Sequence, residues 1–287
     1  IWFNGALVPW REAKLHVLSH ALHYASCVFE GERSYGGVIF KMVEHHERLH
    51  KSAEAMGFEI PYSVEAINAA SMEVLKANGI VDGYVRPVAW RGSEMMGISA
   101  QQTRINVAIA AWEWPSYFTP EARLKGIRLT EAAYRRPPPE CAPVFAKAAG
   151  LYMICTLSKH AAEAKGYQDC LMLDYRGRIS EATGANIFLL QDGKLHTPTP
   201  DCFLDGLTRQ TVIELAQARG VEVIERAIMP EELAKTDEVF LTGTAVEVTP
   251  VSEIDGQIFT VGRLTQELME AYSALVQNPA EASASAA

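Results

Sequence analysis

Apolar residues in the first half of the chain follow two spacings, one typical of strands and one typical of helices. Gly36 and Gly37 separate two apolar runs, which predicts a tight hairpin. Elsewhere apolar positions recur every three or four residues and the series ends at a glycine, which predicts amphipathic helices. The expected strands are residues 1–8 around a turn at Asn4 and Gly5, 28–35, 38–42, 83–91 and 103–112, and the expected helices are 44–56 and 63–78, with Ser63 as N-cap.

A Pro-rich stretch at residues 135–143 divides the pattern. It holds four prolines in nine residues and can form neither a helix nor a central strand, so we expect a connection between domains. The second half is expected to hold helices at 146–165 and 208–219, strands at 171–174, 178–190, 222–228 and 238–242, and a hairpin turn at Asp192 and Gly193. The predicted domains are a smaller N-terminal α/β domain at 1–133, a connection at 134–143, a larger C-terminal domain at 144–277 and a disordered tail at 278–287.

Charge and composition restrict the class of ligand. The chain has 287 residues with 26 Lys and Arg against 35 Asp and Glu, which argues against a nucleic acid partner. Five cysteines with no C-x-x-C spacing favour a reducing, cytoplasmic location over a disulfide framework. No apolar run approaches the ~18 residues that a membrane span needs. The chain starts at Ile1 rather than Met, so we expect an upstream segment, and a removed targeting segment stays possible. A small-molecule ligand is expected.

A short motif in the expected helix at 44–56 offers a metal-binding alternative. His46, Glu47 and His50 match H-E-x-x-H, in which two imidazoles on one helix face hold zinc and the glutamate activates water. The further histidine and glycine of the metzincin pattern do not follow. We therefore favour a polar helix face with no metal, and the zinc peptidase is kept as a remote alternative.

Lys147 has mostly apolar or small neighbours, in the context V-F-A-K-A-A-G at residues 144–150. Loss of solvation there would favour the neutral, nucleophilic amine. The competing interpretation is a lysine whose stem is buried while its amine reaches water.

Three other segments add the chemistry of a phosphorylated cofactor. Gly206 precedes a helix whose N-terminal N–H groups can bind an anion, and residues 243–245 form a second such turn at a strand end. Glu181 lies among small residues in an apolar strand region, where a carboxylate needs a cationic or donor partner. An amine, phosphate holders and an acid for a ring nitrogen form the set that pyridoxal phosphate requires.

The sequence resembles the fold-type IV pyridoxal-phosphate enzymes and, among them, the branched-chain amino acid aminotransferases. The resemblance covers about residues 3–256 and implies a two-domain α/β fold with mixed sheets, of the D-amino-acid aminotransferase type. It also implies pyridoxal 5'-phosphate between the domains and a homodimer or higher homo-oligomer. The motifs that carry it are A-L-H-Y at 21–24, V-F-E-G at 28–31, R-L and S-A at 48–49 and 52–53, Y-V-R-P at 84–87, A-K-A-A-G-L-Y at 146–152, I-S-E-A-T-G-A-N-I-F at 179–188, G-L-T-R at 206–209 and L-T-G-T-A at 241–245.

The resemblance also implies a role for each matching residue. Lys147 would be catalytic, joined covalently to the cofactor and then moving a proton. Glu181 would pair with the pyridinium nitrogen and Tyr152 with the phenolic oxygen. The residues implied to hold the phosphate are Arg48, Leu207, Thr208 and Thr244. Those implied to orient the substrate carboxylate are Tyr84, Arg86, Thr244 and Ala245, and those implied to line the side-chain pocket are Tyr24, Phe29, Trp114, Tyr117 and Ala245.

Two departures from the family pattern bear on substrate range. Glu94 with Met95 and Met96 stands in the loop 92–98 where smaller residues are common, and Glu32 is unusual beside Arg33. The expected reaction moves an amino group between branched-chain L-amino acids (Leu, Ile, Val) and 2-oxoglutarate. A D-amino-acid or (R)-amine transaminase, or an aminodeoxychorismate lyase, is the alternative on the same fold, although Arg86 fits the branched-chain pattern.

Overall fold

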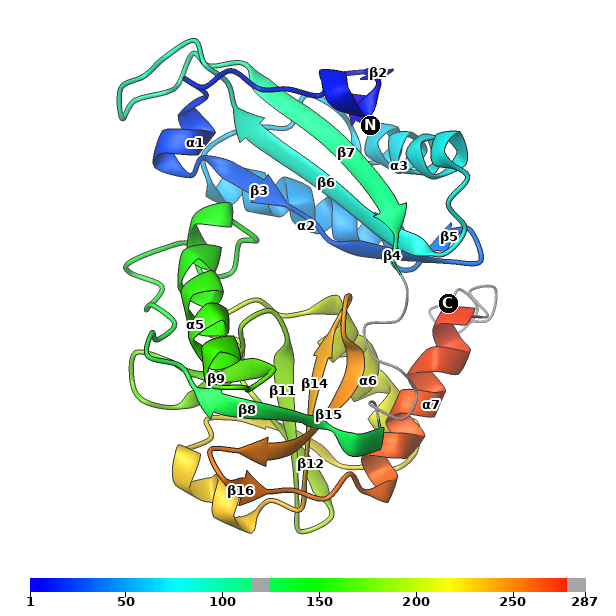
Figure 1. Ribbon diagram of the computed structural model, residues 1–287, viewed down its shortest axis with the longest axis vertical. Coiled ribbons are helices and arrows are strands. Elements are labelled where there is room, and N and C mark those ends of the chain that lie inside the picture. Colours follow the sequence, from blue (N-terminus) through cyan, green and yellow to red (C-terminus); the bar gives the residue numbers. More distant parts are fainter. Residues whose placement is uncertain (115–123, 278–287) are drawn as a thin grey trace. The chain divides into compact units, whose positions relative to one another are not determined.

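The computed structural model of the protein describes residues 1–114 and 124–277. The chain forms two compact units: Ile1–Pro115 with Ala146–Leu151, and Ser116–Phe145 with Tyr152–Ala287. Each unit combines a sheet with helices, as the expected α/β class requires (Figure 1). Within the described ranges no helix has the length and apolarity that crossing a bilayer needs. The expected disordered tail at 278–287 lies outside the described residues.

The first unit is an antiparallel sheet covered by helices α2 and α3 (Figure 1). Its strands run in the order β2-β1-β7-β6-β4-β5, and β3 pairs with β6. The strands are β1 (Trp2–Phe3), β2 (Ala6–Leu7), β3 (Cys27–Phe29), β4 (Glu32–Tyr35), β5 (Val38–Ile39), β6 (Gly83–Arg91) and β7 (Ile105–Glu113). The helices are η1 (Trp10–Glu12), α1 (His20–Tyr24), α2 (Met42–Ala55) and α3 (Val64–Asn78).

Local signals in the sequence account for several of these elements. The Ser63 side chain accepts a hydrogen bond from the Ala66 N–H and so caps α3, as predicted. Gly36 and Gly37 have φ of 58° and 85°, the left-handed pair that a tight hairpin between β4 and β5 needs. The expected strand at 38–42 is too long, because the chain turns into α2 already at Met42.

The second unit is built on a sheet that closes on itself. The strand order β10-β9-β8-β15-β14-β11 is completed by pairing of β10 with β11, while β12 and β13 extend from β11 and β16 pairs with β15. The strands are β8 (Ile127–Glu131), β9 (Asp169–Leu173), β10 (Ile179–Ala182), β11 (Asn186–Gln191), β12 (Lys194–Pro198), β13 (Val223–Arg226), β14 (Glu238–Gly243), β15 (Glu247–Ile254) and β16 (Gln257–Ile258). The helices are η2 (Ala149–Tyr152), α5 (Met153–Ala164), α6 (Leu207–Gln217), η3 (Pro230–Lys235) and α7 (Arg263–Gln277).

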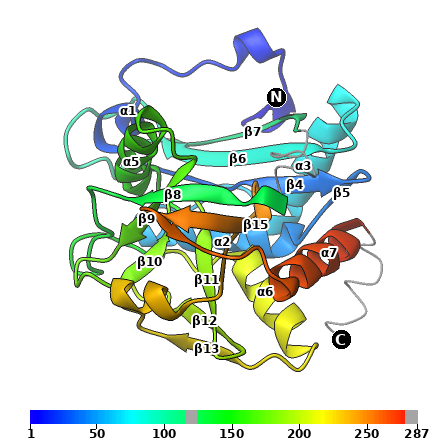
Figure 2. The same cartoon turned by 60° about the horizontal axis from the view of Figure 1, so that its bottom comes forward.

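The closed sheet has an aliphatic core. Leu129, Ile187, Leu189 and Val251 are among its fully buried members, each worth about 1.5–3 kcal/mol of transfer free energy. Outside the closed sheet, α5 packs against β9, and α6 and α7 lie side by side (Figure 2). This core fixes the strand ends and turns from which the candidate site residues project.

Two expectations about the middle of the chain differ from the structure. The expected helix at 146–165 is wrong at its start, because Ala148 forms a β-bridge with Val28 and the α-helix begins only at Met153. The division between the compact units also differs from the expected one at 134–143. Strand β8 precedes the prolines yet pairs with β9 and β15, so it belongs to the second sheet.

Candidate active site

Lys147 is fixed to the first unit by its backbone. Its N–H donates to the Ser52 side chain at 3.0 Å, and its carbonyl accepts from the Phe29 N–H at 3.2 Å. The Lys147 side chain is half-buried, and its Nζ lies 5.2 Å from the centre of the Phe29 ring. The Cζ of Arg86 lies over the same ring at 4.7 Å. An amine and a guanidinium are thus held beside one aromatic side chain.

Arg48 is held by a buried carboxylate. Its Nε and Nη2 donate to the two oxygens of Glu30 at 2.7 and 2.8 Å, and His45 contacts Glu30 at 2.8 Å. Burial acts to raise the pKa of the fully buried Glu30 carboxyl, but Arg48 and His45 together hold it well below its usual range. The bidentate pair therefore sets the direction in which the Arg48 guanidinium points.

An aromatic cluster surrounds Arg86 in the first unit. Tyr84 and Arg86 are two residues apart on β6, and Arg86 Nη2 donates to the Tyr84 hydroxyl at 3.0 Å. The rings of Trp112 and Trp114 lie 5.2 and 5.3 Å from that of Tyr84. The structure thereby brings together four of the predicted substrate-binding residues, Phe29, Tyr84, Arg86 and Trp114.

The remaining predicted pocket residues of the first half do not all fall in this cluster. The Tyr24 ring stacks on His20 at 4.5 Å, and its hydroxyl donates to the Met96 carbonyl at 3.3 Å. Tyr24 is therefore joined to the 92–98 loop, the segment in which the sequence departs from the family pattern. Tyr117 lies outside the described residues.

Glu181 is a nearly buried carboxylate on β10, in the second unit. It pairs across the sheet with Met172 on one side and Asn186 on the other. Its Oε1 lies 3.2 Å from the Nε of Arg136, whose side chain is 5% exposed. The cationic partner that the sequence called for is therefore present.

Asn186 connects the other predicted cofactor-binding segments of this unit. It opposes Glu181 on β10 and Thr242 on β14, and its side chain donates to the Leu204 carbonyl at 3.0 Å. A Cβ on Gly206 would lie 2.3 Å from the Asn186 Oδ1, so only glycine lets the chain pass this close. The start of α6, the hairpin of Glu181 and the end of β14 consequently meet at one end of the closed sheet.

Backbone donors are available at this end. Gly206 is the N-cap of α6 and has no side chain to cap the helix, so the N–H groups of Leu207 and Thr208 point out of its first turn. Thr244 and Ala245 lie in the short connection between β14 and β15, whose strands pair at Gly243 and Glu247. This arrangement suits a phosphate or another oxyanion.

Tyr152 comes from a different part of the second unit. It is the last residue of η2 and the N-cap residue of α5, and it packs against a buried cluster that includes Cys155 and Met172. Met172 is the cross-strand neighbour of Glu181. Tyr152 therefore borders the same buried cluster as the strand that pairs with Glu181.

Comparison with known proteins identifies the family. The model of the family described as amino-transferase class IV matches residues 27–254. The probable branched-chain-amino-acid aminotransferase of Rickettsia felis is 46% identical over 255 residues, covering 89% of this chain and 87% of the relative. The branched-chain-amino-acid aminotransferase of Pseudomonas aeruginosa is 40% identical over 291 residues, with 99% and 95% covered. The chain belongs to the class IV aminotransferases.

Solved structures agree with this assignment. A crystal structure of the T.th. branched-chain amino acid aminotransferase with pyridoxamine 5'-phosphate matches with a TM-score of 0.94 at 40% identity, covering 96% of this chain and 93% of that one. The resemblance drawn from the sequence motifs is confirmed, as is the fold class.

In this class IV aminotransferase the H-E-x-x-H letters do not form a polar helix face. His46 is buried, its Nε2 lies 2.9 Å from a Glu32 oxygen, and its Nδ1 contacts Asn68. Burial favours the neutral His46 ring, but Glu32 and Asn68 raise its pKa, and these two residues contact both ring nitrogens. Glu47 of the motif is exposed. The histidine is thus a buried ion-pair partner rather than a zinc ligand.

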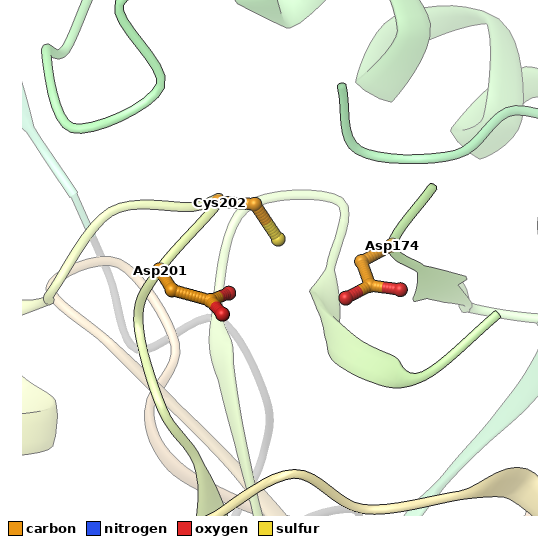
Figure 3. Close-up of side chains that lie close together, drawn as sticks. All are labelled: Asp174, Asp201 and Cys202. Atoms are coloured by element: carbon orange, nitrogen blue, oxygen red, sulfur yellow. The ribbon is translucent and has the colours of Figure 1, made fainter. Parts of the chain in front are cut away.

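Asp174, Asp201 and Cys202 form a separate cluster of ligand-type groups in the second unit (Figure 3). Arg176 lies 2.7 Å from each of the two carboxylates and forms an ion pair with both. Burial raises the pKa of the Cys202 thiol to about 12, so the thiol keeps its proton in the metal-free protein. The cluster is better explained as an ion-pair network.

Several residues of the site were not singled out from the sequence. Glu30, Ser52 and Asn186 each lie inside a quoted family motif, and that position was the available signal. Arg136 lies in the Pro-rich stretch, where nothing in the local sequence indicates its contact with Glu181.

Proposed function

We propose that this aminotransferase moves the amino group of branched-chain L-amino acids to 2-oxoglutarate, with pyridoxal 5'-phosphate as its cofactor. One observation carries the proposal: the Lys147 amine and the Arg86 guanidinium lie over the same Phe29 ring. A nucleophilic amine beside a carboxylate-binding cation suits the α-amino acid group. The names of the similar proteins support the branched-chain substrates.

The residues present fit the cofactor. The N–H groups of Leu207 and Thr208, the Thr244 hydroxyl and the Arg48 guanidinium would hold its phosphate. Glu181 would bind the ring nitrogen, and Tyr152 the phenolic oxygen. When bound, the cofactor supplies an electron sink for the charge that develops at the substrate Cα. The glycine at 206, where a Cβ would meet Asn186 Oδ1 at 2.3 Å, lets the start of α6 lie against Asn186 of β11.

The chain's own residues then perform the proton transfer and the orientation. The Lys147 amine would join to the cofactor and move the proton from Cα. Tyr84 and Arg86, with the N–H groups of Thr244 and Ala245, would orient the substrate carboxylate. An aliphatic side chain would be buried against aromatic rings that offer it no hydrogen bond. The residues proposed for that wall are Tyr24, Phe29, Trp114, Tyr117 and Ala245.

We also propose a homodimer or higher homo-oligomer in the cytoplasm. Large apolar side chains near α1 and the 92–98 loop are exposed, namely Val17 at 69%, Leu22 at 60% and Ile98 at 86%. Exposed apolar groups of this kind support burial against a second subunit. The five cysteines form no disulfide within the described residues, which supports a reducing compartment. Sedimentation at micromolar concentration tests the assembly, and a monomer would refute it.

A panel of half-reactions tests the function. The cofactor-loaded enzyme is mixed with single L-amino acids, D-amino acids and (R)-amines, and conversion to the pyridoxamine form is followed by absorbance. Rapid conversion by L-leucine, L-isoleucine and L-valine is expected, with 2-oxoglutarate reversing it. Conversion by D-amino acids or (R)-amines alone would instead establish the alternative transaminase on this fold.

A further inference from the structure

Arg136 is a buried charge in the second unit that the proposed reaction does not otherwise use. Its backbone N–H donates to the Leu173 carbonyl at 2.8 Å, and the residue forms a β-bridge with Asp174. Its side chain is 5% exposed and points to the Glu181 carboxylate, with Nε 3.2 Å from Oε1. The Nη1 donates to the sulfur of Cys155 at 3.6 Å. The guanidinium is thus fixed by both its backbone and its neighbours.

Glu181 supplies the negative charge that a buried guanidinium requires. Burial acts to lower the pKa of Arg136, but Glu181, ahead of the other neighbouring groups, raises it, so the residue stays charged. Burial raises the pKa of the Cys155 thiol to about 11, so that neighbour is neutral near pH 7. The contact is therefore between a fixed cation and the carboxylate proposed to face the cofactor ring.

Two bases compete for one proton where Glu181 meets the ring nitrogen. A carboxylate beside a fixed cation binds a proton more weakly, which leaves the proton on the nitrogen. Without that cation the buried carboxylate would take the proton, and the ring would become neutral. We propose that Arg136 is a positioning residue that keeps the cofactor ring protonated by holding Glu181 in its ionised form. This role rests on the proposed pairing of Glu181 with the ring nitrogen.

Nitrogen-15 NMR of the enzyme loaded with ring-labelled pyridoxal phosphate reports directly where the proton is. The wild-type resonance is expected in the range of a protonated ring. Arg136→Met and Arg136→Gln are expected to move it toward the unprotonated range and to lower kcat at least about tenfold. Arg136→Lys keeps the positive charge, so its ring resonance and its kcat should both be close to those of the wild type. Circular dichroism shows which variants fold, and cofactor stoichiometry shows which of them bind pyridoxal phosphate.

Arg176→Met is the matched control, because Arg176 is also an ion-paired arginine of this unit, bound to Asp174 and Asp201. It should leave the ring resonance unchanged. Glu181→Gln separates the hypothesis that Glu181 binds the ring nitrogen from the hypothesis that Arg136 keeps Glu181 ionised. A ring resonance unmoved by Glu181→Gln overturns the assigned partner of the ring nitrogen. A resonance moved by Glu181→Gln but by neither Arg136→Met nor Arg136→Gln refutes the role of Arg136 alone.

Discussion

Replacing Gly31 with alanine tests how Tyr84 and Arg86 bind the substrate carboxylate. A Cβ at position 31 would lie 1.8 Å from the Tyr84 hydroxyl oxygen and 2.8 Å from its Cζ. Real Cβ atoms do not approach other atoms closer than 3.0 Å, so the hydroxyl must move by more than about 1 Å. The Tyr84 ring is buried and packs against two tryptophans, and its hydroxyl accepts the 3.0 Å hydrogen bond from Arg86. That bond is expected to break.

The size of the effect follows from the contact that is lost. A hydrogen bond to a charged group contributes about 1.5–3 kcal/mol, which corresponds to roughly 10- to 150-fold in kcat/KM. The loss should fall mainly on KM for the amino acid, because the contacts proposed to hold the cofactor are elsewhere. Overpacking should also cost about 1–3 kcal/mol of stability. Initial rates against L-leucine concentration, cofactor titration and thermal melting measure the three quantities.

Tyr84→Phe provides the matched comparison, since it removes the hydroxyl without introducing a clash. If Gly31→Ala acts through that hydroxyl, the double variant should lose little more kcat/KM than the worse single variant. Losses that simply multiply would show that the two positions are independent. A Gly31→Ala enzyme with wild-type KM would refute the proposed geometry of carboxylate recognition.

Four further changes test the other assignments. Lys147→Ala should abolish turnover and borohydride-trapped cofactor, and trapping on another lysine with normal turnover would contradict its role. Glu181→Gln should keep the cofactor but slow kcat roughly a hundredfold, if about 3 kcal/mol of transition-state stabilisation is lost; a wild-type kcat with an unchanged isotope effect at Cα would count against it. Arg48→Ala should weaken cofactor retention by a few kcal/mol, measured by dialysis and titration, and undiminished retention would exclude a phosphate contact. His50→Ala should change neither activity nor metal content, whereas His46→Ala should lower the melting temperature; chelator-sensitive activity lost with either histidine would revive the zinc peptidase.

Signals confined to a few residues were readable from the sequence. The hairpin at Gly36 and Gly37 and the cap at Ser63 each depend on local backbone geometry, and both are present as predicted. The order of helices and strands around the cofactor motifs was also largely predictable. The strand β8 was missed, because its pairing with β9 and β15 is set by partners far along the chain.

Contacts between distant segments could not be predicted from local pattern. The bond between Lys147 and Ser52 joins residues 95 positions apart, and the one between Glu30 and Arg48 joins a strand end to a helix. The apolar neighbours of Lys147 indicated a desolvated, nucleophilic amine. The β-bridge at Ala148, however, decides the backbone conformation of this segment. Tertiary pairing therefore overrode the helical spacing that predicted a continuous helix there.

The contact between Glu32 and His46 explains two unusual features of the sequence, the glutamate at position 32 and the match to H-E-x-x-H. The Glu32 carboxylate is fully buried and lies 2.9 Å from His46 Nε2, so replacing either residue removes a buried polar partner of the other, although His46 would keep its contact with Asn68. Removing one partner of a buried pair costs about 3–5 kcal/mol, whereas replacing both with apolar residues is often neutral. We therefore expect Glu32→Leu and His46→Leu each to lower the melting temperature by several degrees, and the double variant to regain most of it. Additive losses would show that the two residues do not act as a pair, and that the histidine is buried for another reason.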